Sequence, residues 1–181
     1  MLKRIFLFLL VVPVICSCAS HFINEKNFRD TVASDFESRS EVLSAAGVDL
    51  ASMALAQDEI EALEFLYAYM PLGDIVNHSP EFWLENYRLT RKAVSDMPWG
   101  KSVPERELRH FVLPVRVNNE NLDTSRTVFF RELAHRIKSL SMYDAVLEVN
   151  HWCHEKAVYQ PTDSRTCSPL TIIRTAYGRC G

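Results

Sequence analysis

The sequence ends with the four residues Gly178-Arg179-Cys180-Gly181, and this stretch offers the clearest candidate for covalent chemistry. A cysteine attacks a carbonyl as its thiolate, so its pKa has to be lowered by a helix N-terminus or a nearby histidine. Small neighbours such as Gly178 and Gly181 let the backbone of a substrate approach the sulfur closely. The pattern predicts Cys180 as a candidate nucleophile, but a single-cysteine motif does not define a family.

Glutamate and histidine recur at a spacing that di-iron carboxylate bundles use. The pairs are Glu107/His110, Glu132/His135 and Glu148/His151. At about 100° per residue, the second and third pairs point away from the apolar stripes of their helices, whereas ligands of an interior metal have to face inward. We therefore expect charged residues on solvated helix faces. A di-iron bundle is the last of three alternatives, and metal analysis of the purified protein would test it.

A second cluster, at His151, Cys153, His154 and Glu155, contains zinc-binding residue types. A closed zinc site usually draws paired ligands from two segments, and no second pair matches this one. The residues from 154 to 158 also lack the second histidine of a zinc-protease helix. The sequence therefore predicts neither a metal nor another cofactor.

Aromatic and polar residues in the middle of the chain suggest the walls of a groove. Trp83, Trp99 and Trp152 suit a core or a groove wall better than a ligand cage. The polar loop at 116–120 is typical either of recognition or of a solvated turn. The candidate groove residues are Tyr67, Tyr69, Trp99, Arg116, Asn118, Asn119 and Trp152, with Glu120 beside them.

The N-terminus has the features of an export signal. A basic start is followed by an apolar run from Ile5 to Ile15, which is too short to span a bilayer. The residues Ile15-Cys16-Ser17-Cys18 resemble a bacterial lipobox, so we expect residues 1–17 to be a lipoprotein signal peptide and Cys18 to carry lipid. Cleavage after Ala19 is the alternative. Either way we expect an exported protein of the bacterial cell envelope, and lipidation would tether it to a membrane.

Composition favours an ordinary folded protein with a mildly acidic surface. Hydrophobic residues make up 48% of the chain and charged residues 24%, and the formal net charge is −3. Such a charge argues against general nucleic-acid binding, which needs a basic surface. Beyond the leader, Cys153, Cys167 and Cys180 remain. A Cys153–Cys167 disulfide is possible in an oxidising compartment, but its geometry does not follow from sequence.

Helical spacing dominates the chain and strand-like alternation is nearly absent, so we expect a predominantly α-helical protein. We expect residues 18–27 to form a spacer and residues 28–140 a helical region, with a loop from Leu113 to Thr124. Asp58 with Glu61 predicts the start of one helix, and Ser79-Pro80 the start of another.

The predicted helices continue to the end of the sequence. Ser141 and Asp144 predict a helix start. The inner face of that helix should carry Val146, Val149, Cys153 and Ala157. Ser168-Pro169 opens the last helix, and Gly178 should close it.

Several stretches together resemble the start of a bacterial transglutaminase-like domain, which shares the papain-like arrangement of a cysteine nucleophile. The matching residues are Asn150–Glu155, Thr162–Arg165, Ser168–Leu170 and Gly178–Gly181. The residues Pro98–Gly100 and Leu113–Glu120 resemble the helical region that precedes this domain in exported members. Residues 141–181 would then be the beginning of the domain.

The resemblance implies a catalytic role for Cys180 alone. The sulfur would attack an amide carbonyl of a peptide or protein and form a thioester that water or an amine resolves. In this superfamily a histidine and an aspartate follow later in the chain, so we expect the sequence to be the front part of a longer α+β enzyme and to be inactive as given. The alternative is a non-catalytic helical lipoprotein that binds peptide or glycan in a groove.

Overall fold

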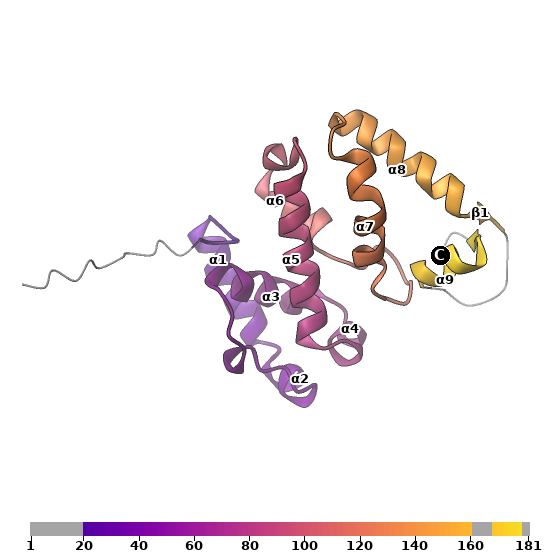
Figure 1. Cartoon of the computed structure of the whole chain (residues 1–181). Helices are drawn as coiled ribbons and strands as arrows, with labels where there is room; N and C mark the ends of the chain where they lie inside the picture. The colour runs from indigo at the N-terminus through magenta and orange to yellow at the C-terminus, as the bar shows by residue number, and fades with distance from the viewer. Residues whose placement is uncertain (1–19, 161–167, 179–181) are drawn as a thin grey trace, which may run out of the picture.

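The computed structural model describes residues 20–160 and 168–178, and nearly all of its regular structure is helical (Figure 1). The prediction of a predominantly α-helical chain is confirmed. The elements are α1 (Lys26–Glu37), α2 (Ser40–Ala45), η1 (Leu50–Ser52), α3 (Gln57–Tyr69), α4 (Leu72–Asn77), α5 (Pro80–Asp96), η2 (Gly100–Ser102), α6 (Glu105–Glu107), the π-helix η3 (Leu108–Val112), α7 (Ser125–Ile137), α8 (Met142–Lys156), β1 (Val158–Tyr159), α9 (Pro169–Thr175) and β2 (Tyr177–Gly178).

Helix α3 is the centre of the main core. It packs against α1 on one side and α5 on the other, and most of its residues are buried. A helix that is apolar on nearly every side has to be covered on nearly every side, which explains its central place. The predicted cap at Asp58 is wrong. The N-cap is Ala56, two residues earlier, and the Glu59 carboxylate accepts its N–H at 2.9 Å. Asp58 instead accepts the hydroxyl of Tyr87.

The segment before α1 belongs to the core, although the sequence predicts a spacer there. Phe22 is 4% exposed and Ile23 is fully buried, and both join the cluster built around α3. The ring of Phe22 meets Tyr87 of α5 edge to face, with 5.5 Å between centroids. The described chain is therefore packed from its first few residues.

A buried carboxylate, Glu61 of α3, holds this segment in place. It accepts the backbone N–H groups of Phe22 at 2.8 Å and Ile23 at 3.1 Å, and it also contacts Nδ1 of His21 at 2.5 Å. Gln57 donates a further bond at 3.1 Å. Burial opposes ionisation of Glu61, but these donors outweigh it and lower the pKa of the carboxyl below its usual value.

Helix α5 begins as the sequence predicts, with Ser79 at the N-cap and Pro80 at the first position, and it buries Trp83 and Tyr87. The helix ends at Asp96, and Gly100 then packs against its last turn. A Cβ at Gly100 would lie 2.0 Å from the carbonyl oxygen of Val94, so only glycine allows η2 to lie against the last turn of α5.

Helices α7 and α8 form a hairpin beside α5 (Figure 1). Ser141 caps α8 by accepting the N–H of Asp144, as predicted. The predicted inner face of α8 is wrong, because Ala145 and Trp152 are buried while Val146 is 63% exposed and Cys153 is exposed. Trp152 turns toward α7 and meets Phe129 edge to face at 5.0 Å.

Ion pairs with α7 explain why α8 buries a different face from the one that its apolar residues predict. Arg136 of α7 donates to Glu148 at 2.5 Å and to both oxygens of Glu155 at 2.9 Å. Lys156 also pairs with Glu132. The glutamates predicted to lie on solvated faces, Glu132 and Glu148, therefore face across the hairpin. The boundary expected between residues 140 and 141 falls in the turn of this hairpin.

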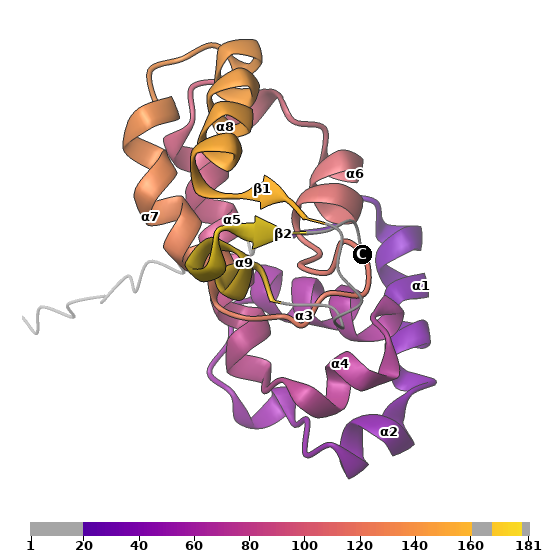
Figure 2. The ribbon, with the colours of Figure 1, turned by 90° about the vertical axis from the view of Figure 1, so that its right-hand side faces the viewer.

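The last described elements form a small unit around a parallel strand pair (Figure 2). β1 and β2 pair in parallel, with Tyr159 opposite Gly178, and α9 connects back to them. Ser168 caps α9 as predicted, by accepting the N–H of Thr171. The expectation that Gly178 closes this helix is wrong. The left-handed residue is Ala176, at φ 61°, and Gly178 lies in β2, where a Cβ would come within 3.1 Å of Ile172.

We expect Glu61→Gln to lower the free energy of unfolding by about 1–3 kcal/mol at pH 7, because the amide cannot serve two backbone donors and His21 as the charged carboxylate does. Since the folded pKa of Glu61 lies below its unfolded value of 4.5, its contribution is complete above pH 4.5 and is lost as the pH falls through the folded pKa. The difference between variant and parent should therefore shrink in acid. Urea unfolding measured between pH 7 and pH 3 checks both points.

The matched control is Glu85→Gln on the exposed face of α5, which should change stability by less than about 0.5 kcal/mol. A Glu61→Gln variant as stable as this control would show that the carboxylate does not anchor the segment.

Candidate functional site

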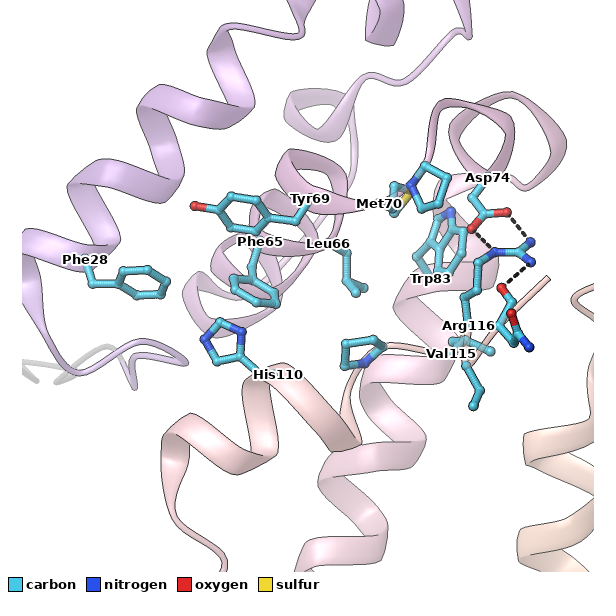
Figure 3. Close-up of a pocket in the computed structure, with 14 residues that line it drawn as sticks. Phe28, Phe65, Leu66, Tyr69, Met70, Asp74, Trp83, His110, Val115 and Arg116 are labelled. Atoms are coloured by element: carbon cyan, nitrogen blue, oxygen red, sulfur yellow. Dashed lines mark hydrogen bonds and ion pairs between the residues drawn. The ribbon is translucent and has the colours of Figure 1, made fainter. Parts of the chain in front are cut away.

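The described residues form a groove of about 710 Å³ between α1, α3, η3 and the segment after η3 (Figure 3). The C-terminal half of helix α3 supplies the floor, where Phe65 contacts Phe28 of α1 and His110 of η3. A groove of this size matches the usual range of ligand pockets. Its lining residues are Phe28, Phe65, Leu66, Tyr69, Met70, Pro71, Asp74, Trp83, His110, Pro114, Val115, Arg116, Val117 and Asn118.

One end of the groove is aromatic. Phe28 of α1, Phe65 of α3 and His110 of η3 converge, as Figure 3 shows, with ring centroids 5.3 Å apart for Phe65 and His110 and 6.3 Å apart for Phe28 and His110. Behind Phe28 lies the guanidinium of Arg109, 4.5 Å from the ring centroid. Edge-to-face and cation–π contacts of this kind fix the orientation of the rings.

His110 is a neutral group at physiological pH. Partial withdrawal of its imidazole from water, followed by the positive charges of Arg109 and Arg106, lowers the pKa of His110 below its ordinary value. A neutral imidazole both donates and accepts a hydrogen bond. It therefore brings a polar but uncharged group to the aromatic end of the groove.

The opposite end carries an ion pair. Arg116 donates to the two carboxylate oxygens of Asp74 through Nε at 2.6 Å and Nη2 at 2.5 Å, and it donates through Nη1 to the carbonyl of Glu120 at 2.6 Å (Figure 3 shows the pair with Asp74). Asp74 is buried, and the paired carboxylate raises the pKa of Arg116 further. A bidentate pair of this geometry holds the chain rigidly.

The loop that forms this wall is hydrogen-bonded to itself and to α7. The Glu120 carboxylate accepts the N–H groups of Val117 at 2.7 Å and Asn118 at 2.8 Å. Arg126 of α7, largely desolvated, donates to the carbonyls of Leu113 and Pro114 at 3.0 and 2.9 Å. The charges of Arg116 and Glu120 are thus engaged within the protein. Their main visible role is to shape the groove.

The predicted groove residues are only partly brought together. Tyr69, Arg116 and Asn118 line the groove, and Asn119 is exposed on the loop next to it. Tyr67 is fully buried in the core, Trp152 packs between α8 and α7, and Trp99 lies beyond the end of α5. None of these last three is part of the groove lining.

Sequence reasoning missed most of the groove lining. Phe28, Phe65 and Leu66 carry the same signal as any core residue, so periodicity cannot tell a groove wall from a packed interior. The role of Asp74 could not be predicted from the sequence because its partner Arg116 lies 42 residues away. The usable signal was His110, a histidine within a short helix of otherwise apolar or basic residues.

Several candidate residues fall elsewhere. Cys18, Cys167 and Cys180 lie outside the described residues, so lipidation, the disulfide and the nucleophile stay predictions. Within residues 20–160 and 168–178, no cluster of histidine, cysteine, aspartate and glutamate could hold a metal ion. In the same part of the chain, no helix has the length and apolar character needed to cross a membrane.

Comparison with protein-family models, with curated proteins and with solved structures finds no match for this chain. The function therefore has to be inferred from the residues and their geometry.

We expect Arg116→Gln to lower the free energy of unfolding by about 2 kcal/mol, because it leaves the buried Asp74 carboxylate without its charged partner. The amides of the loop from 114 to 120 should also exchange with deuterium faster. Urea unfolding and hydrogen-exchange mass spectrometry measure the two effects.

The control is Arg106→Gln, which removes an exposed guanidinium lying 3.8 Å from Glu107 and should change stability by less than about 0.5 kcal/mol. Equal stability of the two variants, with unchanged exchange in the loop, would show that the Arg116 pair does not hold the groove wall.

Proposed function

We propose that this chain is the exported, lipid-anchored front part of a transglutaminase-like cysteine enzyme, with Cys18 as the anchor and Cys180 as the nucleophile. The motif Gly178-Arg179-Cys180-Gly181 and the residues from Asn150 to Leu170 carry the resemblance. The substrate would be an amide of a peptide or protein.

The arrangement of the last described residues supports this proposal. Gly178 is the final residue of β2, which runs parallel to β1, and Cys180 follows two residues later in the sequence. In open parallel sheets, ligands bind beyond the carboxyl ends of the strands. A residue that follows such a strand directly is well suited to reach a substrate there.

In the proposed reaction, the Cys180 thiolate attacks the carbonyl carbon of an amide. The C–N bond breaks, the amine leaves with a proton from the general acid, and a thioester remains on the sulfur. Water then releases an acid, or a second amine forms a new amide. The resemblance places the histidine that exchanges these protons, and the aspartate that orients it, later in the chain than residue 181.

We expect residues 18–181 alone to show no measurable amide hydrolysis or amine incorporation, because loss of triad members costs several orders of magnitude in rate. A longer natural chain that includes the downstream histidine and aspartate should release ammonia from glutamine-containing peptides or incorporate a labelled amine. Cys180→Ala should abolish this activity.

The control is Cys153→Ala, which alters an exposed cysteine on α8 and should leave the rate unchanged. Activity of residues 18–181 that survives Cys180→Ala would contradict the assignment of the nucleophile.

A second candidate function, binding of an apolar peptide segment, is favoured by the groove of about 710 Å³. Its polar groups are mostly engaged internally: Arg116 with Asp74, and the hydroxyl of Tyr69 with Asp35 at 2.6 Å. A glycan needs many hydrogen bonds from its site, whereas apolar side chains need only apolar walls. The groove therefore suits a peptide with aromatic or aliphatic side chains better than a sugar.

The neutral dye N-phenyl-1-naphthylamine is a suitable probe of this groove, since binding to apolar walls enhances its fluorescence. We expect Val115→Phe to weaken dye binding by about tenfold or more, because the larger side chain fills part of the groove. The control is Val128→Phe, on the exposed side of α7, which should bind the dye like the parent. Equal dye affinity in the two variants would place the dye, and the proposed peptide, elsewhere.

A further inference from the structure

The described chain begins with a segment that has almost no freedom relative to the body. Phe22 and Ile23 are buried, and their N–H groups are fixed by the Glu61 carboxylate. His21 contacts the same carboxylate at 2.5 Å. Whatever is attached shortly before His21 is therefore held close to one defined face of the protein.

That face contains a hollow of about 410 Å³ between the N-terminal segment, the end of α5 and η2. In Figure 1, α1, which follows this segment, lies on the other side of α5 from the α7–α8 hairpin. The lining residues on which the argument depends are His21, Arg91, Ser95, Gly100, Lys101 and Glu105.

Two cations in this hollow, Arg91 and Lys101, are exposed and form no ion pair with any residue that the structure describes. Glu105 is the only acidic residue among the described residues that line the hollow, and it is already engaged with Arg109 at 2.5 Å and with Asn24. The nearby charges of Lys92 and Asp96 cancel in a pair of their own. The hollow therefore presents net positive charge.

Lys101 is held in place by the backbone. Gly100 lies against the carbonyl of Val94, where no side chain fits, so η2 and Lys101 are fixed beside the last turn of α5. Arg91 projects from that same helix. The two cations are thus presented by elements that pack against each other, as a preformed site requires.

The short distance along the chain from His21 to Cys18 determines how close this face would lie to a membrane that holds a lipid on Cys18. The three residues from Cys18 to His21 span at most about 11 Å when fully extended. The headgroup layer on each side of a bilayer is about 5–8 Å thick. A lipid on Cys18 would therefore bring the hollow to the level of the headgroups, whatever path the intervening residues take.

We propose that the face around His21, Arg91 and Lys101 docks onto the phosphate headgroups of the membrane that holds the Cys18 anchor. The inference rests on the lipidation included in the proposed function. Electrostatic attraction to an anionic surface adds to a single lipid anchor and fixes the orientation of the body. In this orientation α2, at the other end of α1, points away from the bilayer (Figure 1).

The test uses the full chain expressed in a bacterium, with Cys153, Cys167 and Cys180 changed to serine. Mass spectrometry of the N-terminal peptide first establishes whether Cys18 carries diacylglycerol. A single cysteine is then introduced as Ser95→Cys in the hollow or as Ser44→Cys on α2, both exposed positions. Labelling rates with a membrane-impermeant maleimide are compared between membranes and detergent.

We expect membranes to slow labelling of Ser95→Cys by roughly fivefold or more and to leave Ser44→Cys unchanged. Adding Arg91→Gln and Lys101→Gln should restore much of the rate at Ser95→Cys. The charge-matched pair Arg131→Gln on α7 and Lys138→Gln directly after it, both at exposed positions, should not.

The remaining outcomes overturn the proposal in distinguishable ways. Absence of lipid on Cys18 removes both the anchor and the docking. Equal labelling ratios at the two positions, with lipid present, overturn the docking alone. If inorganic phosphate protects Ser95→Cys in detergent as strongly as membranes do, while chloride of equal ionic strength does not, the hollow is a site for free phosphate.

Discussion

The buried carboxylate of Glu61 is the constraint on which the N-terminal half of the structure depends. A glutamate inside a core is costly unless it is fully satisfied, and here two backbone donors, a histidine and a glutamine supply the bonds. The charged carboxylate fixes the irregular segment before α1 against α3. The packing of Phe22 on Tyr87, and through it the contact between the segment and α5, follows from that bond set.

At the far end of the groove, charged side chains are likewise bound within the protein. The guanidinium of Arg116 pairs with Asp74, and that of Arg126 donates to two carbonyls of the loop after η3. These bonds hold the loop in one shape although it contains no helix or strand. Because those charges are used internally, the surface that remains is formed by rings, prolines and aliphatic side chains. The rigidity of the loop and the apolar character of the groove therefore have one cause.

Local signals in the sequence predicted the elements well, because caps and breakers act over a few residues. Ser79-Pro80 and Ser141 marked true helix starts, and the loop before α7 was found from its polar composition. The orientation of α8 was not predictable, because partners on α7, such as Arg136, decide it and outweigh the apolar stripe of α8 itself. The roles of Glu61 and Asp74 depend on residues about 40 positions away, so spacing alone assigned Glu61 to a cap and left Asp74 unnoticed.

The long sequence separation between Glu61 and its partners has a consequence for biosynthesis. Translation proceeds from the N-terminus, so His21, Phe22 and Ile23 are made about 40 residues before the carboxylate that secures them. During that interval the segment has no native partner on α3, so its packing has to wait until that helix is made. Completion of α3 therefore sets the earliest point in synthesis at which the first described residues can reach their folded position.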